Sequence, residues 1–184
     1  MSSPGGERRR ALPELEVLSV AEPAPDWVPG VLEAFSTAAD SISSLSHTGV
    51  SSDAALAAIR PSLVAIGFEV EATKAKIDMI TRPVLFGENG AVLVQYDVDA
   101  YHPEHRVVLE VEAGRGAASN ADYRDLVRAS LMVDVSYLVL AMMLTYKGGG
   151  QTMRSYKIAR NRIDAILASE RLALPLDGVL LVGY

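Results

Sequence analysis

Hydrophobic and polar positions alternate with two different periods along the chain, and each period predicts a class of element. Residues 30–45 are expected to form a first helix, and a second helix starts at Ser52, a candidate N-cap, with apolar residues at helical spacing behind it. Gly67 is placed to end the second helix. The period then changes to two, so 68–77 is predicted to be a half-buried strand.

The second half of the sequence predicts a hairpin, a further strand pair, and alternating helices and strands. Residues 82–87 and 91–100 read as strands on either side of a turn at 87–90, written GENG. The other elements we expect are a strand at 107–112, a helix from Ser119, an inner strand covered on both sides at 136–143, a helix at 152–172 and a short strand at 177–184. The KGGGQ segment before the last helix is expected to be a flexible connection.

Four carboxylates fall on the polar faces of two neighbouring strands. Side chains alternate along a strand, so Asp97 and Asp99 share one face of 91–100. Glu110 and Glu112 share one face of 107–112, opposite its apolar residues. The short HPEH connection at 102–105 forces the two strands into an antiparallel hairpin. With the turn centred on Pro103 and Glu104, Asp97 is expected to face Glu110 directly.

The helix expected from Ser119 has a capping pattern, Ser119-x-x-Asp122. Its predicted buried face consists of Tyr123, Leu126, Val127 and Leu131. The opposite face carries Asn120, Arg124 and Arg128, which recur every four residues and form one stripe, with Arg115 just before it. Arginine donors suit phosphate groups, so these four residues are candidate contacts to a nucleic-acid backbone. The alternative is a solvated face of ion pairs with Asp122 and Asp125.

Composition narrows the protein class. Residues 1–29 are rich in Pro, Gly, Ser and Glu and are expected to be a mobile tail, which leaves 30–184 as a single α/β domain. The 184 residues include no cysteine, so disulfides, thiolate zinc sites and cysteine nucleophiles are excluded. We found no membrane span or secretory signal, and we expect a cytoplasmic protein. The net charge of −6 disfavours indiscriminate coating of nucleic acid.

The carboxylates on the two strands repel one another unless a cation lies between them. Hard cations such as Mg²⁺ and Mn²⁺ take carboxylate, carbonyl and water oxygens, and they promote phosphodiester hydrolysis by acidifying water and neutralising charge on the phosphate. His102 and His105 do not supply the four ligands of a structural zinc site. The competing interpretation is a solvated outer sheet face, where like charges are tolerated.

An acidic residue on one strand of a hairpin, then Glu-x-Glu on the next, followed by a helix and an inner strand, resembles the PD-(D/E)xK nuclease superfamily over roughly residues 52–143. The resemblance implies a restriction-endonuclease-like core with a central mixed β-sheet flanked by helices. It makes Asp99 the first metal ligand, with Asp97 as the fallback, Glu110 the second, and the backbone carbonyl of Val111 a third.

The resemblance further implies a Mg²⁺- or Mn²⁺-dependent endonuclease acting on DNA as a homodimer. Glu112 stands where most members of the superfamily have lysine, and it is expected to act on the attacking water or to hold a metal. Catalytic residues on this interpretation are Asp99, Glu110 and Glu112. Glu69 and Glu71 both remain candidates for an extra acidic ligand. The alternative function is an inactive nuclease-fold protein that binds nucleic acid or a protein partner, which Glu in place of Lys favours.

Overall fold

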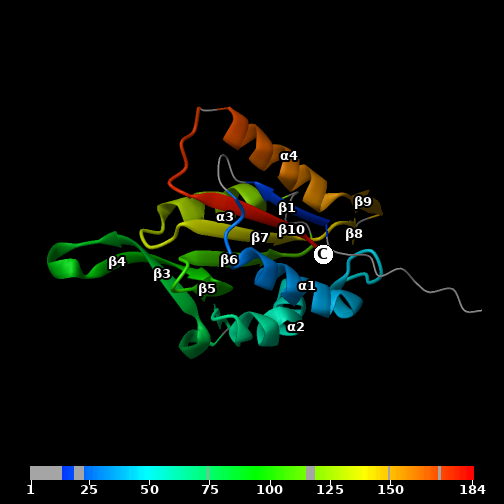
Figure 1. Cartoon of the computed structure of the whole chain (residues 1–184), viewed down its shortest axis with the longest axis horizontal. Coiled ribbons are helices and arrows are strands. Elements are labelled where there is room, and N and C mark those ends of the chain that lie inside the picture. Colours follow the sequence, from blue (N-terminus) through cyan, green and yellow to red (C-terminus); the bar gives the residue numbers. More distant parts are fainter. Residues whose placement is uncertain (1–13, 19–22, 74, 115–118, 149, 170) are drawn as a thin grey trace, which may run out of the picture.

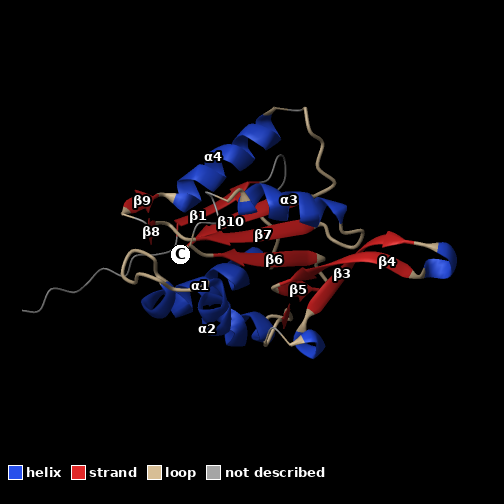
Figure 2. Cartoon of the chain, turned by 180° about the vertical axis from the view of Figure 1, so that it is seen from behind, coloured by secondary structure: helices blue, strands red, loops and turns tan. Residues whose placement is uncertain are grey.

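The computed structural model describes residues 14–18, 23–73, 75–114, 119–148, 150–169 and 171–184, and in it a six-stranded mixed sheet separates two layers of helices (Figures 1 and 2). The strands of this sheet, in spatial order, are β1 (Glu14–Leu18), β10 (Gly178–Gly183), β7 (Tyr137–Met142), β6 (Val107–Glu112), β5 (Ala100–His102) and β2 (Glu69–Val70). The three central strands β10, β7 and β6 run parallel, whereas β1, β5 and β2 join antiparallel.

Helices cover both faces of the sheet. One face packs against α1 (Val28–Ile42) and α2 (Ser52–Ala65), and the other against α3 (Ala121–Leu131) and α4 (Ser155–Ala168) (Figure 1). Strand β7 is buried on both faces, as its continuous apolar run predicted: Val139 packs in the α1–α2 core and Leu140 in the α3–α4 core. The expectation of an α/β protein with a mixed sheet flanked by helices is confirmed.

Two further strand pairs lie outside the main sheet. β3 (Ile80–Phe86) and β4 (Val92–Val98) form an antiparallel hairpin around the short 3-10 turn η2 (Glu88–Gly90), as the GENG motif predicted. β8 (Tyr146–Gly148) and β9 (Gln151–Met153) form a second hairpin where we expected a flexible connection. Among the described helices, none combines the length and the apolar character that crossing a bilayer requires.

The N-terminal elements differ from expectation in detail. Strand β1 lies within the segment 1–29 that we expected to be a mobile tail, because its alternating residues pair with the edge of β10 and prolines exclude only a long helix. Mobility of that segment stays a prediction. The N-cap of α2 is Ser51, whose hydroxyl accepts from the Ala54 N–H at 3.1 Å, so assigning the cap to Ser52 was wrong by one residue.

The strand predicted at 68–77 is much shorter. Only Glu69–Val70 pairs with β5, and the 3-10 turn η1 (Lys76–Asp78) follows within the predicted range. Gly67 ends the preceding helix with φ of 98°, a conformation that glycine adopts without strain, as predicted.

The expected strand 91–100 is two strands separated by a bend at Asp99. β4 belongs to the hairpin with β3, and β5 belongs to the main sheet. His102 pairs with Val107 around a four-residue turn in which Arg106 has φ of 56°, so Ala100 pairs with Leu109. This register places Asp99 level with Glu110, and the expectation that Asp97 faces Glu110 was wrong because the turn is longer than assumed.

Helix α3 buries a face that the sequence did not predict. Its N-cap is Asn120 in the left-handed conformation, without a side-chain cap bond, so the N-cap lies one residue beyond the predicted Ser119. Asp122 and Asp125 are each 1% exposed, while Tyr123, Val127 and Leu131 are exposed. The acidic residues are buried because arginines pair with them: the Arg162 guanidinium lies 2.9 Å from Asp122 and Arg124 lies 2.9 Å from Asp125. Leu126 is buried as predicted.

Candidate active site

A cleft of about 460 Å³ lies beside β6, where the bend between β4 and β5 faces helix α3. It brings together most of the residues that the sequence nominated. The side chains and backbone that line it are Glu71, Met79, Asp97, Val98, Asp99, Glu110, Arg124 and Arg128. Acidic side chains and two arginine side chains therefore share one cleft.

The bend at Asp99 fixes the first carboxylate. Asp99 Oδ2 accepts a hydrogen bond from the Val111 N–H at 2.8 Å, and the Asp99 carbonyl accepts from the Glu71 N–H at 2.9 Å. Two neighbouring strands thus hold this residue from both sides. A residue in an extended strand directs its N–H and C=O to the same side, so the Val111 carbonyl also faces Asp99. Asp97, by contrast, is exposed.

Glu110 is the most unusual group in the cleft. Its residue is only 8% exposed, and its Oε1 atom has no hydrogen-bond partner among the described residues. Within that part of the chain the nearest cation is Arg128 Nη1, 3.8 Å away, beyond hydrogen-bonding distance. Burial raises the pKa of Glu110 well above its usual range, the charges of Asp99 and Asp125 raise it further, and Arg128 opposes them. The carboxyl group therefore lies beside other acids with one oxygen unsatisfied.

Glu112 lies next to the cleft, although it does not line it. Its Oε1 is 2.5 Å from an Arg124 nitrogen. Burial raises the pKa of Glu112 to about 8, assisted by the hydrogen bond to Asp125 and by the charge of Asp125, and Arg124 offsets only part of the increase. Its main-chain carbonyl accepts from the Tyr184 hydroxyl at 3.1 Å. This carboxyl therefore titrates near neutral pH, where a group can both accept and donate a proton.

Asp125 organises the two arginines, and sequence analysis assigned it only to a solvated face. Arg124 Nε lies 2.9 Å from its Oδ1, and Arg128 Nη1 lies 3.6 Å from the same atom. Arg128 also donates to the Asp97 carbonyl and stacks over the Tyr96 ring at 5.3 Å. The position of Asp125 between the two arginines was visible in the sequence, but its burial was not.

The remaining nominated residues separate into two groups. Of the two candidates for an extra acidic ligand, Glu71 is buried in the cleft and Glu69 is exposed. Asn120 caps α3 and does not line the cleft, so the predicted stripe of contacts is not brought together as a whole. Arg115 lies outside the described residues.

The oxygen atoms available in the cleft fit a hard cation that takes only a few of its ligands from the protein. No group of three or more Asp, Glu or His side chains is arranged to hold a metal ion within the described ranges. Mg²⁺ commonly uses one or two carboxylates and completes its shell with water and substrate oxygens. Asp99 and Glu110, with the Val111 carbonyl, supply a set of this size, and the orphaned Glu110 oxygen needs a partner that no described residue provides.

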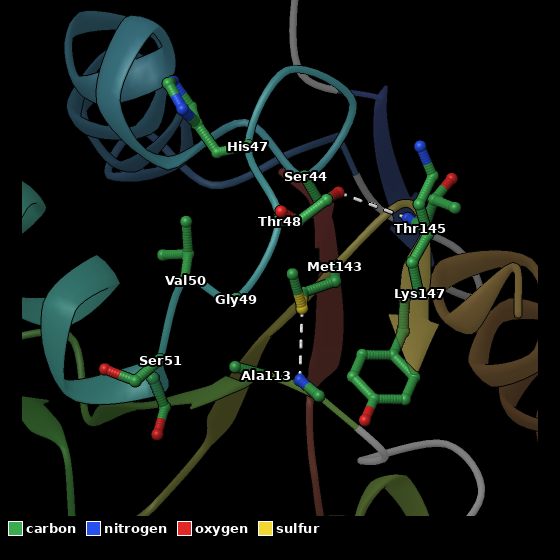
Figure 3. Close-up of a pocket in the computed structure, with 13 residues that line it drawn as sticks. Ser44, His47, Thr48, Gly49, Val50, Ser51, Ala113, Met143, Thr145 and Lys147 are labelled. Carbon is green, nitrogen blue, oxygen red and sulfur yellow. Dashed lines mark hydrogen bonds between the residues drawn. The ribbon is translucent and has the colours of Figure 1, made fainter. Parts of the chain in front are cut away.

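A second cavity of about 310 Å³ lies beyond the ends of β6 and β7, near the start of α2 (Figure 3). Its lining includes the hydroxyl groups of Ser44 and Thr145 and the amine-bearing Lys147, and the Ser44 hydroxyl accepts from the Thr145 N–H at 3.2 Å. None of its described lining residues is an aspartate or a glutamate. The groups that can hold a hard cation are therefore in the cleft and not in this cavity.

Comparison with known proteins gives no match to any family model, curated protein or solved structure. The fold and the cleft define an α/β protein with an acidic site at the side of its central sheet.

Proposed function

We propose that the protein is a divalent-metal-dependent endonuclease that hydrolyses phosphodiester bonds in DNA. The observation that carries the proposal is the buried Glu110 oxygen that lacks a hydrogen bond and lies level with Asp99. A buried acid beside a second acid is costly without a cation, and a hard divalent cation is the partner that two carboxylates and a carbonyl suit. On the same proposal, α2, β2, β5, β6, α3 and β7 form a restriction-endonuclease-like core.

Each side chain then has a defined task. Asp99 and Glu110 would hold Mg²⁺ or Mn²⁺ with the Val111 carbonyl, and Asp97, the fallback ligand, is less suited because it is exposed. When bound, the cation would supply acidification of water and neutralisation of charge on the scissile phosphate. Glu112, whose pKa is about 8, orients the attacking water and accepts its proton.

The two arginines that line the cleft are suited to binding a phosphate group of the substrate. Arg124 and Arg128 line the same hollow as the carboxylates, and a guanidinium presents paired donors to phosphate oxygens. Asp125 restrains both side chains, so they are oriented before substrate binds. An acidic protein can in this way bind nucleic acid through a local basic surface.

The test is hydrolysis of plasmid and single-stranded DNA in Mg²⁺, Mn²⁺ or chelator. We expect cleavage by the wild type only with metal, and none by Asp99→Ala or Glu110→Gln. Glu33→Gln, which alters an exposed acid on α1 outside the cleft, is the matched control and should cleave normally. Cleavage in chelator, or full activity of either cleft variant, would contradict the proposal.

A second function is favoured by one contact. The Glu112–Arg124 ion pair engages the carboxylate that should act on water and one arginine that should bind phosphate. This contact suits an inactive member of the same fold that binds nucleic acid or a protein. The same assay separates the two functions, because this alternative predicts no cleavage under any metal condition and, where the partner is nucleic acid, DNA binding that Glu110→Gln does not change.

A further inference from the structure

The hairpin of β3 and β4 projects from the body as an arm (Figures 1 and 2). Its two strands form their own sheet and do not join the main one. The arm starts at the cleft, since Met79, Asp97 and Val98 at its base line that hollow. Its tip, around the turn at Glu88–Gly90, is the part furthest from the body.

The arm is apolar along nearly its whole length, but the body covers only the inner half. The register pairs Ile80 with Val98 at the base and Phe86 with Val92 near the tip, and two irregularities between Pro83 and Phe86 interrupt the alternation of faces between these pairs. At the base of the arm Val98 is buried, and Ile80, Val84 and Tyr96 pack against the α3–α4 core. Towards the tip the apolar residues are exposed: Phe86 is 46% exposed, Val92 47% and Val94 38%.

The apolar side chains in the outer half of the arm are not covered by any described element. A two-stranded ribbon alone is at best marginally stable, and three or more strands or a packing partner are needed for stability. Both strands of the arm are edges, each with backbone N–H and C=O groups on its outer side that no strand of the described chain pairs. Leu85, which pairs with Val94, and Leu93 are also exposed. These features together indicate a surface that is covered in the functional protein.

The near absence of charged residues in the outer arm indicates which kind of partner it binds. Between Pro83 and Tyr96 the only charged residue is Glu88, in the turn. Nucleic acid is a poor occupant, because binding phosphate depends on lysine and arginine, and this segment has neither. Two copies of the chain, each with a net charge of −6, repel one another through most of their surfaces. The uncharged outer arm is a surface on which two copies meet without burying a charge.

We propose that the outer half of the β3–β4 arm, from Pro83 to Tyr96, is an interface with the same segment of a second copy. Exposed apolar side chains there, counted over both faces of the ribbon, amount to roughly 400 Å² per copy. Covering them in both copies buries at most about 800 Å², and pairing of the open strand edges brings the total toward the 1,000 Å² that a specific interface needs. The two cleft-bearing bodies are then joined through the arms.

The proposal does not depend on the proposed hydrolysis, and its first test is the mass of the full-length protein in solution. We expect sedimentation at about 10 μM to give the mass of two chains for the wild type and of one chain for Val92→Lys, with dimer affinity at least about 100-fold weaker because a lysine would be buried without a partner. Val64→Lys is the matched control, since Val64 is 55% exposed on α2, and it should remain dimeric.

The absence of cysteine permits a second test. Single cysteines at positions 86, 92 and 94 should yield a disulfide-linked pair of chains under mild oxidation, faster at one position or more than Val64→Cys does. A wild type that stays monomeric up to about 100 μM, or equal cross-linking at all four positions, would overturn the proposal. So would a Val92→Lys variant that loses DNA binding while its mass matches that of the wild type, because the arm would then contact nucleic acid.

Discussion

Helix α3 lies between two buried acidic regions that the protein treats in opposite ways. On the side of α4, Asp122 is 1% exposed and both of its oxygens accept from Arg162 Nη1 at 2.9 Å. On the side of the cleft, Glu110 is almost as buried but keeps an oxygen without a hydrogen bond. Both oxygens of Asp122 therefore have a cationic partner, whereas one oxygen of Glu110 has none among the described residues.

The difference separates a structural acid from a functional one. A buried charge that meets its partner contributes to a well-packed interior, and removing that partner is costly. A buried acid that other acids surround raises the free energy of the folded state, and such groups concentrate at functional sites. Glu110 and Asp122 therefore make a pair of probes, and substitutions at the two positions should have opposite effects on stability and activity.

The largest expected effect is on hydrolysis. Glu110→Gln should lower the rate by about 10³, equivalent to ~4 kcal/mol, because a neutral amide is a poor ligand for Mg²⁺. In chelator the same variant should be at least as stable as the wild type, since the amide does not repel Asp99. Initial rates of plasmid cleavage and urea unfolding measure the two quantities. Normal cleavage by Glu110→Gln would contradict the functional role of Glu110.

Next in size is the loss of the ion pair between Asp122 and Arg162. Asp122→Asn should lower the free energy of unfolding by about 3 kcal/mol, because it leaves Arg162 partly buried beside an uncharged group. Hydrolysis per folded molecule should not change. Urea unfolding gives the first value, and Arg162→Met in the same background should restore part of it. Equal stability of Asp122→Asn and wild type would contradict the structural role.

A slightly smaller effect is expected from metal itself. Mg²⁺ at 100 times its dissociation constant should stabilise the wild type by about 2.7 kcal/mol, because ligand bound only to the folded state shifts the unfolding equilibrium. The midpoint of thermal unfolding reports this shift. Asp122→Asn should retain it and Glu110→Gln should lose it. An equal shift in both variants would place the ion elsewhere.

The smallest expected effect is a pH dependence of stability without metal. The folded pKa of Glu112 is about 8 and its ordinary value is 4.5, so the folded state binds more protons and the stability from this group is present at low pH and lost as pH rises towards 8. We expect a loss of roughly 2 kcal/mol between pH 5 and 8 after allowing for solvent screening. Urea midpoints in chelator measure it, and Glu112→Gln should reduce the slope, while the part contributed by Glu110, whose pKa burial also raises, should remain. Stability that rises across this range would contradict it.

Much of the fold followed from the sequence because its patterns are local. The apolar run at 136–143 predicted the doubly covered strand β7, and GENG predicted the turn of the arm. The nominated carboxylates Asp99 and Glu110 do share a cleft with Arg124 and Arg128. Alternation along strands and four-residue recurrence along a helix were sufficient to bring these residues to one place.

The failures depend on tertiary contacts that no local pattern contains. One residue with positive φ, Arg106, set the length of the turn and moved the level partner of Glu110 from Asp97 to Asp99. The buried face of α3 was mispredicted because Arg162, forty residues further along, pairs with Asp122 and compensates its burial. Nothing near Asp125 in the chain indicated that it would be enclosed with two arginines.

The position of β10 has a consequence for biosynthesis. This strand lies between β1 and β7, so the sheet cannot close around its parallel centre until Gly178–Gly183 has left the ribosome. Until then a nascent chain exposes one unpaired border of β7, its most apolar strand, and β1 has no neighbour to join. Pairing of segments so distant in sequence is slow, and a chain that exposes this strand border is therefore expected to bind chaperones until it folds.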